Sequence, residues 1–130
     1  MKLLFDTHAF LWWTSSPERL PSTVVEQLCS PQSELYLSAA SAWEVRIKEQ
    51  LNRLSLSEPW QNIVDREVAH NGLQLLPISF FHTNHLLHLQ PLHKDPFDRM
   101  LMAQSLAEEM FLVSGDTWIR SYPKIRVLWS

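Results

Sequence analysis

The sequence predicts an α/β protein in which helices cover both faces of a parallel sheet. Short apolar segments with the character of strands alternate with amphipathic segments along the whole chain. Such alternation is typical of a parallel sheet, because each connection between parallel strands crosses over through a helix. The 130 residues are 45% hydrophobic and include six Trp and six Phe, which is enough for one core. We therefore expect residues 1–130 to form a single domain.

The predicted elements follow from apolar spacing and from the positions of proline and glycine. The strands are expected at residues 3–5, 34–38, 73–78, 111–113 and near 125–129. Apolar positions from Ala40 to Leu51 recur at steps of three and four, which indicates an amphipathic helix. Pro21 suits a first helical turn, and Gly72 is placed to end a helix. The helices are expected at 9–13, 21–30, 39–51, 58–70, 79–89 and 97–109.

Four acidic residues lie in small or apolar surroundings, where a carboxylate is unusual. Asp6 and Asp116 each follow a short apolar strand. Glu44 lies on the border of the apolar stripe of its helix, and Asp98 lies in the first turn of another helix. Ligands of open parallel sheets bind beyond the carboxyl ends of the strands. All four acids can therefore reach one cleft.

Carboxylates gathered in one cleft favour a bound cation. They would repel one another by roughly 3 kcal/mol per pair at about 5 Å and an effective dielectric of about 20. Either some of them stay protonated or a cation binds. Oxygen ligands without Cys or a nearby pair of His favour Mg²⁺ or Mn²⁺ over zinc. Such a site can activate water for attack on a phosphate, and Thr7 or Ser114 could add a hydroxyl ligand or orient that water.

Each acid also has a purely structural interpretation. Glu44 fits a capping box with Ser41, and it also fits a favourable i,i+4 pair with Lys48. Asp98 fits the preference for an acid near a helix start. Asp6 is the hardest to explain locally, because an Asp that ends a strand has little other use there. The hypothesis of a metal site therefore depends on the joint pattern.

The charge of the chain does not by itself indicate a nucleic-acid partner. The net charge is −3, whereas phosphate binding usually requires a basic surplus. Without the four acids, however, 14 − 4 = 10 acidic residues face 11 basic ones. Bound divalent cations would leave the site attractive to phosphate, and Lys48 or Arg99 could guide a phosphate group toward it.

Cysteine usage and hydropathy bear on the compartment. The lone Cys29 excludes an intramolecular disulfide, and the N-terminus does not have the character of a leader. No apolar run approaches the roughly 20 residues of a membrane helix, so we expect no membrane partner and a cytoplasmic protein.

Several motifs occur in one order across nearly the whole chain. They are DTHAFLWW, SAASAWEVRIK, LPI, HKDPFDRMLMAQSLA, LVSGD and IRVLW. In these motifs the chain resembles the PIN-domain ribonucleases, specifically the VapC-like toxins of bacterial toxin–antitoxin pairs. The resemblance implies a three-layer α/β/α sandwich with a central parallel sheet. It also implies that Asp6, Glu44, Asp98 and Asp116 form a catalytic Mg²⁺ or Mn²⁺ site, although Ser114 stands where Thr is common.

The resemblance implies further properties of the protein. These are endonucleolytic cleavage of RNA, formation of homodimers or of hetero-oligomers with an antitoxin, and inhibition by a cognate antitoxin that enters the active groove. The sequence leaves open which RNA is cut, whether one or two metal ions bind, and which antitoxin is the partner. It also leaves open whether the cluster around Trp12 and Trp13 belongs to the core or to an interface.

The residues also allow two alternatives to a nuclease. His82, His85 and His88 recur every third residue and His93 follows, so a zinc-binding, non-catalytic interaction module could use these four side chains. A phosphoryl-transfer or receiver-like domain could instead be built around Asp6. A phosphatase of the dehalogenase type would need a second Asp two residues later, where this chain has His8.

Overall fold

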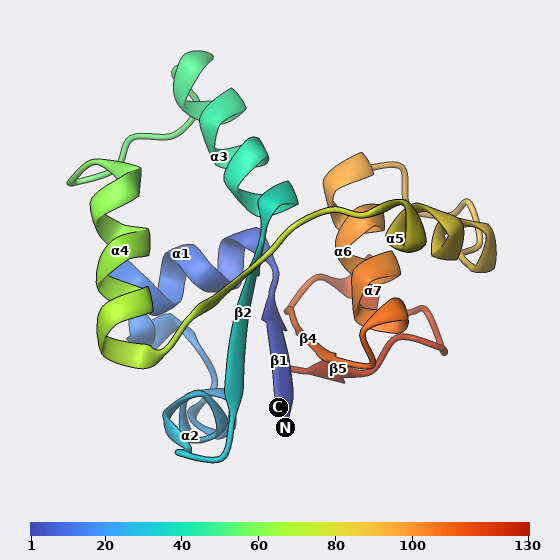
Figure 1. Cartoon of the computed structure of the whole chain (residues 1–130), viewed down its shortest axis with the longest axis horizontal. Helices are drawn as coiled ribbons and strands as arrows, with labels where there is room; N and C mark the ends of the chain where they lie inside the picture. The colour runs from blue at the N-terminus through green and yellow to red at the C-terminus, as the bar shows by residue number, and fades with distance from the viewer.

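The computed structural model describes residues 1–130 and has the predicted three-layer α/β/α sandwich around a parallel sheet (Figure 1). Every strand pairing is parallel, and the strand order is β3-β2-β1-β4-β5. All five predicted strands are present, and β3 and β5 are shorter than expected. The strands are β1 (Lys2–Phe5), β2 (Glu34–Ser38), β3 (Gln74–Leu76), β4 (Phe111–Val113) and β5 (Val127–Leu128).

The helices connect the strands and form the two outer layers. They are α1 (Thr7–Ser15), α2 (Ser22–Cys29), α3 (Ala39–Gln50), α4 (Trp60–Asn71), α5 (Phe80–Asn84), α6 (Pro96–Ala107) and α7 (Thr117–Arg120), with short 3₁₀ helices η1 (Pro17–Arg19) and η2 (His85–His88). None of the helices combines the length and the apolar character that a bilayer crossing needs.

The prediction of one helix over residues 79–89 is wrong. The segment forms α5 and then the 3₁₀ helix η2. The buried His82 stabilises the first turn of α5, whereas Leu87 of η2 is exposed to solvent. The segment therefore lacks the continuous apolar face that stabilises a longer helix. Helix α7 was not predicted, because its four residues are too few to show a helical period.

The strand β1 separates two hydrophobic clusters, because alternate side chains of a strand point to opposite faces. Leu3 and Phe5 pack with α1, α2 and α4, whereas Leu4 packs with α6 and α7. Figure 1 shows these two groups of helices on opposite sides of the sheet. Most of the aromatic cluster of α1 belongs to the first core. Phe10 is fully buried, and Trp12 and Trp13, with Leu11, pack partly buried against the same cluster.

Hydrogen bonds between α1 and α4 hold these two helices together in one of the outer layers. The indole Nε1 of Trp13 donates to Glu67 Oε1 at 2.8 Å, and Asn71 Nδ2 donates to both carboxylate oxygens of Glu67. Glu67 is largely buried, so these donors satisfy a carboxylate that water hardly reaches. Gly72, with φ +65°, ends α4 in the left-handed conformation, as predicted.

The substitution Trp13→Phe should lower the free energy of unfolding by about 1–2 kcal/mol, because it removes a donor from a buried carboxylate while keeping most of the apolar contact. Urea unfolding followed by circular dichroism measures this loss. Trp43→Phe is the matched control, since Trp43 is 60% exposed and should tolerate the change. Equal stability of the two variants would show that the hydrogen bond contributes nothing.

Candidate active site

Two of the four acids are placed by tight turns from a strand into a helix. Asp6 stands between β1 and α1, and its Oδ1 accepts the backbone N–H of Ala9 at 2.6 Å. Asp116 stands before α7, and its Oδ1 accepts the N–H groups of Trp118 and Ile119. Both acids are therefore N-caps. The interpretation that Asp6 has little local use is wrong, because it begins α1.

Glu44 enters the site from the second turn of α3. That helix starts directly after β2 with Ser38 as its N-cap, so the capping box of Ser41 with Glu44 is not formed. Instead, Thr7 Oγ1 donates to Glu44 Oε1 at 2.6 Å and lies 3.0 Å from Ser41 Oγ. Lys48 Nζ pairs with Glu44 Oε2 at 2.9 Å, which confirms the i,i+4 pair. Both oxygens of Glu44 are thus engaged by neighbouring side chains.

Asp98 lies in the first turn of α6, as predicted. Asp95 is the N-cap of this helix, and Asp98 Oδ2 lies 2.8 Å from His93 Nε2. One ligand atom each of His93, Asp98 and Asp116 lie within 4.8 Å of one another. This is the one group of three or more His, Cys, Asp or Glu residues in the chain that approaches so closely.

Burial is the main influence on the two acids whose pKa is displaced. It raises the pKa of Asp6 from 3.8 to about 6, against hydrogen bonds from Ser114 and Ala9 that lower it. The negative charge of Asp98 raises the Asp6 pKa further. Asp6 therefore belongs to the same electrostatic cluster as Asp98.

The pKa of Asp98 is also raised, first of all by burial. The hydrogen bond from His93 lowers this pKa, while the negative charges of Asp95 and Glu44 raise it. The structure thus brings Asp6, Glu44, Asp98 and Asp116 to one edge of the sheet, and adds the imidazole of His93. The carboxylate oxygens of these acids are a donor set that fits Mg²⁺ or Mn²⁺.

The four residues predicted to contact substrate all have partners within the chain. Thr7 and Lys48 both bind Glu44, as described above. Ser114 is fully buried, and its Oγ accepts the N–H of Asp116 at 3.1 Å. Arg99 points to the loop before α6, where its Nη1 donates to the carbonyl oxygens of Gln90 and His93. These side chains therefore shape the site from within the fold.

The structure does not bring the four histidines of the zinc hypothesis together. His82 Nε2 lies 2.7 Å from Glu108 Oε2, and its Nδ1 accepts the N–H of Ser79. His93 contacts Asp98 instead. The sequence pattern reveals neither of the two acidic partners, which are Glu108 for His82 and Asp98 for His93. One feature of the sequence does indicate the contact of His93 with Asp98. His93 precedes Asp98 by five residues, and a proline that begins a helix lies between them.

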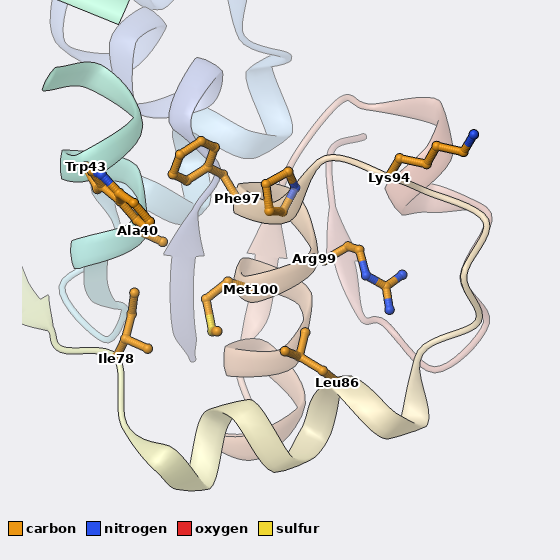
Figure 2. A pocket seen from close by; sticks show the side chains of 9 residues that line it. Ala40, Trp43, Ile78, Leu86, Lys94, Phe97, Arg99 and Met100 are labelled. Atoms are coloured by element: carbon orange, nitrogen blue, oxygen red, sulfur yellow. The ribbon is translucent and has the colours of Figure 1, made fainter. Parts of the chain in front are cut away.

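Two pockets flank the acids. One, of about 310 Å³, is lined by Asp6 and Asp116 together with Trp12 and Trp129. The other, of about 300 Å³, is mostly apolar and lies between α3 and α6 (Figure 2). Figure 2 shows Trp43 of α3 and Phe97 of α6 at this second pocket, and their rings meet edge to face with centroids 5.2 Å apart. Asp6 and Asp116 thus line the first pocket, and the residues that directly precede Glu44 and Asp98 line the second.

In a parallel α/β sandwich, acids at the carboxyl edge of the sheet lie where such folds bind ligands, and acids gathered there can hold divalent cations. The model of the PIN domain family matches residues 3–125. The chain therefore belongs to the PIN domain family.

Individual relatives agree with this family. The chain is 26% identical over 140 residues to Ribonuclease VapC22 of Mycobacterium tuberculosis (strain ATCC 25618 / H37Rv), with 98% of each protein covered. Its fold is similar to VapBC2 from Rickettsia felis bound to a promoter DNA fragment, with a TM-score of 0.74 at 15% identity and 100% of both chains covered. It is also similar to VapBC-1 from nontypeable Haemophilus influenzae, with a TM-score of 0.61 at 16% identity over 91% of this chain and 89% of that one. A toxin–antitoxin complex from Klebsiella pneumoniae has a TM-score of 0.60 at 16% identity, over 95% of this chain and 94% of that chain.

The substitution Asp6→Asn should stabilise the metal-free protein above pH 6. The raised pKa means that the folded state holds the proton more tightly than the unfolded state, so stability is lost as pH rises from about 4 to about 6. The loss amounts to about 3 kcal/mol, and Asn avoids it while still capping α1. Urea unfolding in EDTA at pH 5 and pH 7.5 measures the difference.

The exposed Asp65 offers the matched control for this substitution. Asp65→Asn should change stability little and equally at both pH values. A metal-free Asp6→Asn protein that is less stable than the wild type at pH 7.5 would contradict the raised pKa.

Proposed function

We propose that this chain is a Mg²⁺- or Mn²⁺-dependent endoribonuclease that acts as the toxin of a bacterial toxin–antitoxin pair. The observation that carries the proposal is the gathering of Asp6, Glu44, Asp98 and Asp116 at one edge of the sheet. The name of the relative Ribonuclease VapC22 supports the choice of RNA as substrate. The whole chain would act as one domain in the cytoplasm, where its substrate is found.

The four acids would have different tasks in this reaction. Asp98 and Asp116 each keep one oxygen engaged within the chain, so that the other can hold a divalent cation. A bound cation would supply positive charge that activates water and neutralises the phosphate. Asp6 lines the pocket beside Asp116 and would complete the ligand set. Glu44 is held by Thr7 and Lys48, which orients its carboxylate toward the same centre.

Basic side chains would then guide the RNA backbone toward the acids. Lys94 lies in the loop just before α6 and makes no ion pair within the chain, so its charge is available to a phosphate. Lys48 could exchange Glu44 for a phosphate once a cation neutralises the acids. Arg99 is already bound to loop carbonyls, so it would act mainly by holding that loop.

RNA cleavage tests the catalytic proposal directly. Purified wild type should cut structured RNAs in Mg²⁺ or Mn²⁺ but not in EDTA. Asp6→Asn and Asp98→Asn should each lower the rate by roughly 100-fold or more, which is the scale for loss of a catalytic electrostatic group. Denaturing gels of labelled RNA give these rates.

The exposed Asp65→Asn variant, purified in the same way, should cleave like the wild type. Equal cleavage by all the variants would mean that a contaminant or a different site does the cutting. Induced expression in bacteria without an antitoxin tests toxicity, and normal growth would count against it.

The proposed partners are a cognate antitoxin and a second copy of the chain. VapBC and toxin–antitoxin assemblies among the structural relatives support the antitoxin. For the second copy, the support is the mostly apolar pocket of Figure 2, where Trp43 is 60% and Ile78 is 38% exposed. Exposed aromatic and aliphatic side chains that gather at one place are typical of protein interfaces.

The substitution Trp43→Ser should weaken the homodimer, because it removes a large exposed ring from the centre of the proposed interface. Light scattering after size exclusion should give twice the chain mass for the wild type and a mass falling toward one chain for the variant. Trp118→Ser is the control, since Trp118 is similarly exposed but lies on α7. A monomeric wild type at high concentration would refute this interface.

A further inference from the structure

The loop between η2 and α6 is folded so that it fixes the backbone of His93. The hydroxyl of the buried Tyr122 accepts the N–H of His93 at 2.9 Å and donates to the carbonyl oxygen of Gln90 at 2.7 Å. Arg99 donates to the same Gln90 carbonyl and to the carbonyl of His93. His93 is thus held on both sides of its Cα.

The imidazole ring of His93 is held by two contacts of its own. It stacks on Trp118 with an angle of 3° between the planes and 6.2 Å between the centroids. Its Nε2 lies 2.8 Å from Asp98 Oδ2. A carboxylate accepts hydrogen bonds, so the bond assigns the proton to Nε2. A separation of 2.8 Å is typical of a strong, charge-assisted bond.

The same ring lies close to both Asp98 and Asp116. Trp118, on which it stacks, lies in α7, whose N-cap is Asp116. Asp98, to which it donates, lies in the first turn of α6. The orientation of His93 therefore depends on α7 and sets the rotation of the Asp98 carboxylate.

We propose that His93 is a positioning residue, which orients Asp98 so that its free oxygen faces a divalent cation shared with Asp116. This role rests on the proposed metal-dependent function. In metal sites generally, the carboxylate ligands are themselves held by hydrogen bonds, and losing such a partner weakens metal binding. The nitrogen of His93 acts on Asp98 and does not itself bind the cation.

Mn²⁺ binding to the full chain tests this role without measuring catalysis. His93→Ala should weaken Mn²⁺ binding by about 10-fold or more in calorimetry or in electron paramagnetic resonance of free Mn²⁺. His93→Gln should remain close to the wild type, because the Gln amide can donate from the position of Nε2. His88→Ala is the matched control, since His88 is exposed and makes no side-chain hydrogen bond. RNA cleavage by His93→Ala should recover at saturating Mn²⁺.

Three results separate this role from its alternatives. Unchanged Mn²⁺ affinity in a folded His93→Ala protein would overturn the role and leave the nuclease proposal intact. Nitrogen coupling to Mn²⁺ in pulsed resonance spectra, lost in His93→Ala, would make His93 a ligand and overturn the positioning role. A wild type that binds neither Mn²⁺ nor Mg²⁺ would overturn the metal-dependent function together with this role. Thermal unfolding in EDTA verifies that each variant is folded.

Discussion

Burial of carboxylates beside one another, with the repulsion that follows, is the constraint that the rest of this structure has to meet. The helices α1, α3, α6 and α7 all begin near the site, and their first N–H groups lack partners within the helix. Asp6, Asp95 and Asp116 accept hydrogen bonds from such groups. These hydrogen bonds come from the backbone alone, and they offset part of the repulsion between the carboxylates. The chain can therefore bring the acids together before any cation binds.

The offset is incomplete, because the pKa values of Asp6 and Asp98 both stay raised. The pKa of Asp6 stays near 6 although Ala9 and Ser114 both bind it, because its burial outweighs their hydrogen bonds. The acids of the site also differ in how many of their oxygens are engaged within the chain. Glu44 uses both oxygens for Thr7 and Lys48, whereas Asp98 and Asp116 each use one. A cation would therefore find its available oxygens mainly on the side of α6 and α7.

The sequence predicted the parts of this fold that repeat a period and missed the parts set by single side chains. Five strands and five helices follow apolar spacing, so their positions were predictable to within a few residues. By contrast, α7 depends on the cap by Asp116, and the break after α5 depends on the buried contacts of His82. Neither contact follows a regular spacing of residues, so the sequence alone does not reveal it.

The candidate site follows the same division. Parallel strands bring their carboxyl ends to one edge, which is why the acids after β1 and β4 could be expected to meet. The contact of His93 with Asp98 could not be derived in this way, because it requires a loop that Tyr122 and Arg99 fold back. The metal-binding hypothesis named the acids from their surroundings, but the histidine was assigned to a different cluster.

The apolar pocket and the acids share the same two helices, which couples the proposed interface to the proposed chemistry. Trp43 directly precedes Glu44 on α3, and Phe97 directly precedes Asp98 on α6. The edge-to-face contact of the two rings therefore joins the helices that carry these acids. A protein partner that covers the rings would hold α3 against α6, and so would hold Glu44 near Asp98. The pocket that Asp6 and Asp116 line shares no lining residue with the apolar pocket, so it would stay accessible to RNA.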